Sequence, residues 1–245
     1  MKQIGDTPAV AQAGATPARP SWGRLIATLA LLLAIIGAIS YGAFAVAYPF
    51  GWLARPETRL ATFLIGAIVG ELAALGALIG LLRRRGTGLR ALGLGKPATW
   101  RGLALGLAVA IVYAGLTAAL NPTVGPNLLK LTFLKGLAIV AALVAGLVEE
   151  TIFRGYVMTS LQQMGRGRVA QVLVSGAAFA IAHFYGFVSP TAILTTFGFT
   201  FLLGAALAIT YLVSRRSLTP VIVSHTLIDI VIEPWLLLGF FTGAA

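Results

Sequence analysis

Three short patterns place ionisable side chains within otherwise apolar stretches of this chain. They are Glu149-Glu150-x-x-x-Arg154, Phe179-x-x-x-His183 and His225-x-x-x-Asp229. The chain has seven acidic residues and two histidines, and five of the acids and both histidines lie in such stretches. A charged group in hydrocarbon costs ~2.5–3.5 kcal/mol on insertion scales, so each one calls for a reason. Carboxylates and imidazoles are common general bases, and the patterns therefore predict a polar reaction site inside a membrane.

The helical period predicts different orientations, and therefore different roles, for the two adjacent glutamates. Glu150 and Arg154 are four residues apart with the acid first, which is the favourable order for an ion pair on a helix. Glu149 is rotated by about 100° from Glu150 and is expected to point elsewhere. We therefore expect Arg154 to neutralise Glu150 and to leave Glu149 free for chemistry. The alternative is a structural ion pair beside a second acid that faces water near a helix end.

The two histidines are predicted to reach the same region from neighbouring helices. Glu149 and His183 lie at equal distances along the chain from a turn at residues 165–167, so an antiparallel hairpin places them at about the same depth. His225 and Asp229 are four apart and share one helix face. The alternative for His183 is a hydrogen-bonded packing residue. The alternative for His225 and Asp229 is a structural pair whose polar groups only satisfy each other's hydrogen bonding inside the bundle.

Other residues in the apolar stretches have plainer interpretations. We expect Glu71 to be a buried partner for Arg154, and Glu233, which precedes a proline, to mark the end of a helix. Three pairs of glycines have the spacing that lets helices approach closely, and we expect them to serve helix packing: Gly66/Gly70, Gly76/Gly80 and Gly102/Gly106.

The elements that must position these residues are transmembrane helices. Hydrophobic residues make up 58% of the 245 residues and charged residues 10%, against about 25% charged in a soluble domain. A spanning helix needs about 20 apolar residues, and continuous rather than alternating apolar stretches exclude a β-barrel. The predicted fold is an all-α, polytopic transmembrane bundle with seven spans, at residues 25–50, 60–82, 102–120, 136–162, 169–187, 191–213 and 218–241. The stretch Trp235–Phe241 is a candidate eighth, separate helix.

The distribution of positive charge predicts the orientation. With the N-terminus in the cytoplasm, the inner segments carry thirteen Lys and Arg residues and the outer segments four: Arg55, Arg59, Lys130 and Lys135. This asymmetry follows the positive-inside rule, and we expect an integral protein of the plasma membrane. The rule also accounts for the net charge of +11, so no nucleic-acid partner is expected. The chain has no cysteine, which excludes disulfides and thiolate metal sites.

The chain is expected to form one domain in the lipid bilayer. Residues 1–24 are polar and rich in Ala, Pro and Gly, and we expect a disordered cytoplasmic tail rather than a cleavable signal peptide. Residues 25–245 form the transmembrane domain, and its reactive core is expected at about residues 136–232.

Taken together and in this order, the three patterns resemble the CAAX-processing and bacteriocin-processing family of intramembrane proteases (CPBP, or Abi). The resemblance covers about residues 136–232. It implies a CAAX-type intramembrane peptidase, a hydrolase that forms no covalent intermediate and cleaves a membrane-associated protein or peptide. The implied roles are a general base at Glu149, water positioning at His183, oxyanion stabilisation at His225 and Asp229, and support of Glu149 by Glu150 and Arg154.

The sequence departs from the family pattern at one position, and its residues are compatible both with a metal-free site and with a zinc site. Prenyl-protein proteases of the family often have Asn where this chain has Asp229; an amide can donate to an oxyanion, whereas a carboxylate donates only when protonated. Asp229 is therefore expected either to act protonated or to orient His225. Two histidines with Glu and Asp would be an acceptable zinc set; we expect a metal-free site, with zinc as the alternative.

Two other functions compete with proteolysis. Carboxylates and imidazoles in spans also mark proton pathways, so a proton-coupled transporter is the main rival. A member of the family that no longer cleaves and acts as a scaffold or immunity factor is the second. No pattern specifies the substrate's sequence, its prenylation or the oligomeric state.

Overall fold

The computed structural model describes residues 20–183 and 190–242, and this part of the chain is helical with no strand. Most of the predicted tail (1–19) and the end of the fifth predicted span (184–187) lie outside the described residues. The helices are α1 (Trp22–Ala47), α2 (Pro56–Arg84), α3 (Trp100–Leu120), α4 (Phe133–Glu150), the π-helix η5 (Thr151–Val157), α5 (Met158–Gln163), α6 (Arg168–Ala182), α7 (Pro190–Val213), α8 (Thr219–Ile232) and α9 (Trp235–Thr242).

The predicted all-α membrane fold is confirmed. Five helical segments are long and apolar enough to cross a bilayer: α1 with its short extension, α2, α3, the continuous run from α4 to α5, and α7. Two predicted spans are shorter than expected, because α6 has 15 residues and α8 has 14. The separate helix predicted beyond Pro234 is α9. Short 3₁₀ turns η1 (Tyr48–Phe50), η2 (Trp52–Ala54), η3 (Leu89–Leu92) and η4 (Gly125–Asn127) lie in the connections.

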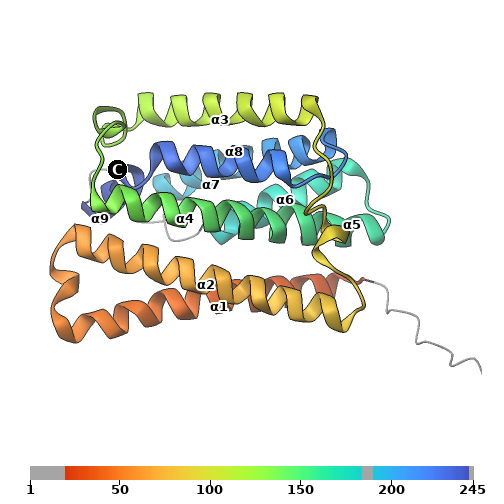
Figure 1. Ribbon diagram of the computed structural model, residues 1–245, viewed down its shortest axis with the longest axis horizontal. Helices are drawn as coiled ribbons and strands as arrows, with labels where there is room; N and C mark the ends of the chain where they lie inside the picture. The colour runs from red at the N-terminus through yellow and green to blue at the C-terminus, as the bar shows by residue number, and fades with distance from the viewer. Residues whose placement is uncertain (1–19, 184–189, 243–245) are drawn as a thin grey trace, which may run out of the picture.

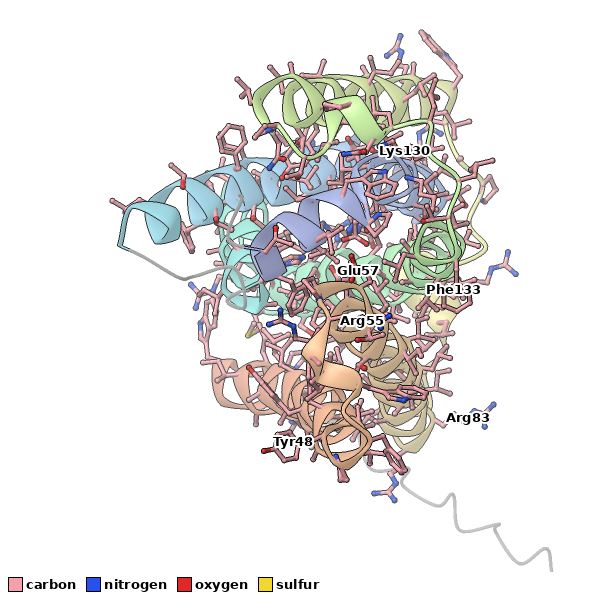
Figure 2. All side chains as sticks on the ribbon, turned by 90° about the vertical axis from the view of Figure 1, so that its left-hand side faces the viewer. Tyr48, Arg55, Glu57, Arg83, Lys130 and Phe133 are labelled. Atoms are coloured by element: carbon pink, nitrogen blue, oxygen red, sulfur yellow. The ribbon has the colours of Figure 1, made fainter. Side chains whose placement is uncertain are left out.

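The helices run side by side along the long axis of the molecule (Figure 1). α1 packs on α2, α2 packs on α4, α4 packs on α8, and α8 packs on α3. α6 and α7 pack together behind these helices. Large apolar side chains such as Ile26, Leu107 and Ile111 are exposed on the outside of this bundle, as lipid requires. Figure 2 looks from the left-hand end of Figure 1 and labels Arg55 and Lys130 from the connections at that end and Glu57 from the first turn of α2.

Glycines bring several of these helices into close contact. A Cβ atom on Gly66 or Gly70 would lie 2.9 Å from backbone atoms of α1, and one on Gly106 would lie 2.8 Å from the carbonyl oxygen of Pro220 on α8. Gly102 packs in the same way on Ser214, so these two predicted pairs serve helix packing. The pair Gly76/Gly80 does not, since no atom lies within 4 Å of either position.

α4 and α8 pack closely at Gly146, which the sequence did not single out. A Cβ atom there would lie 2.2 Å from Thr226 Oγ1 and 3.2 Å from the carbonyl oxygen of Ile222. Both atoms belong to α8, and Thr226 follows His225 directly. Gly146 therefore sets the distance between the helix that carries the two glutamates and the helix that carries His225.

We expect Gly146→Ala to separate α4 from α8 and to destabilise the protein by ~1–3 kcal/mol, the usual cost of overpacking. Gly136→Ala is a matched control on the same helix, because nothing lies within 4 Å of that position. The control should be neutral or slightly stabilising, since Ala favours a helix over Gly. Thermal unfolding of both variants in detergent checks this prediction, and equal stabilities would contradict it.

Lys135 is not the outer-loop charge that the sequence suggested. Its side chain is buried, and Nζ donates to the backbone carbonyl oxygens of Ile230, Val231 and Glu233. These are carbonyls at the C-terminal end of α8, which lack partners inside the helix and attract a cation. Lys135 therefore fixes the end of α8 against α4, and its charge gives no information on topology.

Candidate active site

The predicted ion pair between Glu150 and Arg154 is present and fully buried. Arg154 Nη1 donates to Glu150 Oε1 at 2.7 Å, and Nη2 donates to the carbonyl oxygen of Gly204 on α7 at 3.0 Å. The guanidinium carbon lies 4.4 Å from the ring centroid of Phe179. Glu71 is not among its partners, so the expected pairing of Glu71 with Arg154 is wrong.

The ion pair lies where the backbone changes from an α-helix to a π-helix. α4 ends at Glu150, and η5 runs from Thr151 to Val157, so Arg154 is on the π-helix. Such segments are rare and are frequent at functional sites. Spacing alone could not reveal it, because the sequence pattern of an i,i+4 pair is the same in either helix.

The ring of His225 joins both adjacent glutamates. Its Nδ1 lies 2.8 Å from Glu150 Oε1, and its Nε2 lies 3.3 Å from Asp229 Oδ2 and 4.0 Å from Glu149 Oε2. The expectation that Glu149 points away from the surroundings of Glu150 is therefore only half right. The two acids do diverge, but the imidazole is wide enough to present one nitrogen to each.

His183 approaches Glu149 from the other side. Its Nδ1 lies 2.8 Å from the carbonyl oxygen of Phe179, and its Nε2 lies 3.7 Å from Glu149 Oε2. A carbonyl oxygen only accepts, so we assign the proton to Nδ1, and in the neutral ring a lone pair at Nε2 then faces the carboxylate. The separation of 3.7 Å is too long for a direct hydrogen bond and suits a bridging water.

Phe179 holds these groups in place, a role that the sequence did not reveal. Its ring is buried, with its centroid 4.4 Å from the ring of His183 and 5.5 Å from that of His225. It also packs edge-on against Phe153. One aromatic ring thus touches both histidines and covers the guanidinium of Arg154. The sequence marked it only as part of a pattern; an apolar residue one turn before a buried His was the available signal.

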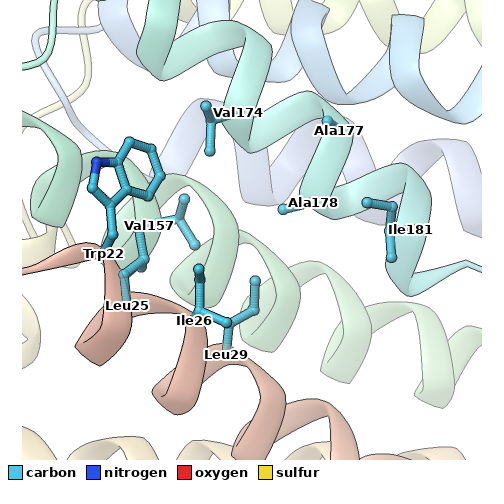
Figure 3. A pocket seen from close by; sticks show the side chains of 9 residues that line it. All are labelled: Trp22, Leu25, Ile26, Leu29, Val157, Val174, Ala177, Ala178 and Ile181. Atoms are coloured by element: carbon cyan, nitrogen blue, oxygen red, sulfur yellow. The ribbon is translucent and has the colours of Figure 1, made fainter.

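One part of the cluster is buried, and another part is accessible to solvent. Glu150 and Arg154 are inaccessible, whereas the side chains of Glu149 and His183 are 18% and 20% exposed. A separate cavity of about 250 Å³ between α1 and α6 is lined by apolar side chains, among them Leu29 and Ala178 (Figure 3). None of the candidate residues lines that cavity. The polar groups of the cluster that solvent can reach are those of Glu149, His183 and Asp229, whose side chains are all partly exposed.

The part of the chain that carries this cluster matches a known family. Residues 131–231 match the family model for type II CAAX prenyl endopeptidase, Rce1-like. This match is consistent with the resemblance of the three patterns to the CPBP family. No curated protein and no solved structure matches the chain. The matched segment starts beside α4 and ends near the end of α8, so it contains every candidate residue, while α1, α2 and α3 lie before it. The chain is thus an integral membrane protein, and its matched segment resembles a protease domain.

Zinc is the alternative cofactor for this site, and the donors that could face it are His183, His225, Glu149 and Asp229. Among the described residues, no group of three or more His, Asp or Glu side chains is placed to hold one ion. His225 Nδ1 faces Glu150, and His183 Nδ1 faces a backbone carbonyl. Each ring therefore has only Nε2 directed at Glu149.

Two acids that the patterns did not include lie within electrostatic reach of this cluster. Glu71 is buried on α2. Glu233 directly follows α8, and its backbone carbonyl oxygen accepts from Lys135 Nζ. The expectation that Glu233 marks a helix end is right, because α8 ends at Ile232.

Proposed function

We propose that the protein is an intramembrane endopeptidase in which Glu149 is the general base. The observation that carries this proposal is the position of Glu149 Oε2. This atom is buried without a hydrogen-bond partner and lies 3.7 Å from His183 Nε2 and 4.0 Å from His225 Nε2. A carboxylate oxygen that faces two imidazole nitrogens across the width of a water is suited to hold and deprotonate that water.

In the proposed reaction, a water bound between Glu149 and His183 attacks the carbonyl carbon of the scissile peptide bond. Glu149 takes one proton from the water as the new C–O bond forms. The negative charge moves to the carbonyl oxygen, which His225 Nε2–H stabilises by a hydrogen bond. When the C–N bond breaks, Glu149 returns the proton to the leaving amine. No covalent intermediate and no metal takes part.

The remaining residues keep His225 able to donate. Glu150 Oε1 accepts from Nδ1, and Asp229 Oδ2 lies beside Nε2, so only the doubly protonated ring can donate toward both carboxylates. We therefore propose that Asp229 orients the ring of His225, which is the second of the two roles expected for Asp229. Arg154 balances the charge of Glu150, and its contact with Phe179 holds both histidine rings.

The proposed substrate is a membrane-associated protein or peptide, and the proposed location is the plasma membrane with a cytoplasmic N-terminus. The family description names CAAX prenyl endopeptidases, so peptides that end in a prenylated CAAX sequence are the first to assay. Unprenylated copies of the same peptides and single transmembrane segments complete the panel. Cleavage by the purified protein in lipid vesicles, with products identified by mass spectrometry, tests the proposal.

A proton-coupled transporter is the second candidate, because Glu71 and Glu233 are two further acids within electrostatic reach of the cluster. Transport would require a proton path that continues to both faces of the membrane. Proton flux into vesicles that contain the protein, abolished by Glu233→Gln but insensitive to His183→Ala, would favour this candidate over proteolysis.

Removal of divalent ions is expected to leave cleavage intact, and His183→Ala is expected to lower kcat by ~10²–10⁴ through loss of water positioning. Elemental analysis of the active protein provides the independent reading, since a catalytic zinc would be present at about one per chain. Metal content should be negligible and the same in wild type and His183→Ala. Stoichiometric zinc that disappears in the variant would overturn the metal-free mechanism and leave the peptidase assignment in place.

A further inference from the structure

A groove on the outside of the bundle separates α1 from α6, and we call it the α1–α6 groove. It is the cavity of about 250 Å³ described above, and its walls are aliphatic apart from Trp22. Trp22 lies at one end of the groove and Ile181 at the other, and Val157 of η5 completes the wall (Figure 3). The helices on either side have other partners, since α1 packs on α2 and α6 packs on α7.

The groove opens toward lipid and has the size of a hydrocarbon chain. Ile26 on α1 and Ile181 on α6 are 61% and 55% exposed, and lipid tails are as apolar as these side chains. A transmembrane helix is ~10–12 Å across with its side chains and is too wide for the space. A single acyl chain is narrow enough to lie along it.

A cation lies at the Trp22 end of the groove. The guanidinium carbon of Arg166 is 5.5 Å from the ring centroid of Trp22. The backbone of Arg166 is fixed, because its N–H donates to the carbonyl oxygen of Leu161 at 2.9 Å and its carbonyl oxygen accepts from Gln171 Nε2 at 2.7 Å. Within the described part of the chain, no carboxylate forms an ion pair with this guanidinium. Arg166 can therefore receive a phosphate.

The helix ends add positive charge at the same place. α1 begins at Trp22 and α6 begins at Arg168, so the positive ends of both helix dipoles lie near Arg166. Tryptophan and arginine are also the residues that anchor a protein at the level of the lipid headgroups. Basic pockets between transmembrane helices bind anionic headgroups. The groove thus combines an aliphatic body with a cationic end.

We propose that the α1–α6 groove binds one anionic phospholipid, with an acyl chain along Leu29 and Ala178 and the phosphate beside Arg166. Any lipid tail can fill the groove, so the charge of the headgroup decides which lipid is retained. The bound chain joins α1, which precedes the matched segment, to α6, which lies within it. None of the groove residues belongs to the site of Glu149, so this inference does not depend on the proposed function.

Native mass spectrometry of the full chain in detergent tests the headgroup. The probes are phosphatidylglycerol and phosphatidylcholine with the same acyl chains. Wild type should retain one phosphatidylglycerol per chain and bind phosphatidylcholine about fivefold more weakly, the effect of one arginine near an anionic lipid. Arg166→Gln should lower the retention of phosphatidylglycerol to that of phosphatidylcholine. Arg101→Gln is the matched control and should behave as wild type, because Arg101 lies at the same 5.5 Å from the ring of Trp100 but outside the groove.

Thermal unfolding tests the groove itself. A ligand that binds only the folded state raises Tm, so phosphatidylglycerol should raise the Tm of wild type more than phosphatidylcholine does. Ala178→Leu fills the space of the acyl chain and should lose this difference. Its Tm without added lipid should equal or exceed that of wild type, because filling a cavity stabilises a protein. Ala108→Leu, the same change at an exposed position of α3, should keep the difference.

Three results would overturn the proposal. Equal retention of both lipids by wild type would show that the groove does not select a headgroup. A lipid-dependent rise in Tm that persists in Ala178→Leu would place the phosphatidylglycerol elsewhere on the protein. A raised KM for prenylated peptides in Ala178→Leu, with unchanged retention of phosphatidylglycerol, would assign the groove to the apolar chain of a substrate.

Discussion

A Glu149→Gln protein is expected to cleave peptides ~10²–10⁴ times more slowly than wild type, and to unfold at the same temperature. The amide keeps the shape of the side chain but cannot take a proton from water. Its surroundings tolerate the change, because Glu149 Oε2 has no hydrogen-bond donor to lose and its side chain is partly exposed. The measurement is single-turnover cleavage of a fluorogenic peptide in lipid vesicles, with thermal unfolding in the same preparation.

A matched control makes this result specific to the base. Glu57→Gln, which makes the same chemical change at an exposed position on α2, should retain full activity. Wild-type activity in Glu149→Gln would exclude Glu149 as the base. Equal loss of activity and stability would show instead that Glu149 is a structural residue.

Glu150→Gln is expected to destabilise the protein by ~3–5 kcal/mol, the usual consequence of leaving a buried charge without its partner. Arg154 is inaccessible and would keep only the carbonyl oxygen of Gly204 and the ring of Phe179. His225 would also lose the carboxylate beside Nδ1. Activity should therefore fall together with stability, in contrast to Glu149→Gln.

The paired variant Glu150→Gln/Arg154→Met separates charge from packing. Removing both charges should recover much of the lost stability, because an uncharged pair leaves no unpaired ion in the interior. Activity should not return, since His225 still lacks its acceptor. Glu150→Gln with wild-type stability would contradict the assigned role of the ion pair.

Contacts along one helix were predictable from the sequence, and contacts between helices were predictable only in outline. The pair Glu150–Arg154 follows from the helical period, and the depth of His183 relative to Glu149 follows from the hairpin. The position of His225 between two acids does not, because it depends on how α8 is rotated against α4. That rotation is set by packing at Gly146 and Thr226, which residue spacing does not express.

Other predictions are wrong because hydropathy describes the composition of a segment and not the residues that its side chains contact. Lys135 was counted as a loop charge because it follows a polar connection, yet it binds the end of α8. Glu71 was expected to be a buried partner for Arg154, whereas the structure pairs Arg154 with Glu150. The predicted lengths of the spans at α6 and α8 were too long, because the structure ends these helices at Ala182 and Ile232.

The π-helix between α4 and α5 imposes a constraint on chain length as well as on residue type. A π-helix closes its hydrogen bonds over one more residue than an α-helix does, so η5 holds a residue that an α-helix of the same rise would not need. Deleting one residue between Thr151 and Val157 would let the segment rewind as an α-helix. The side chains that remain in the segment would then point in new directions relative to Glu149 and Glu150. Over evolution this stretch can therefore exchange side chains more readily than it can gain or lose a codon.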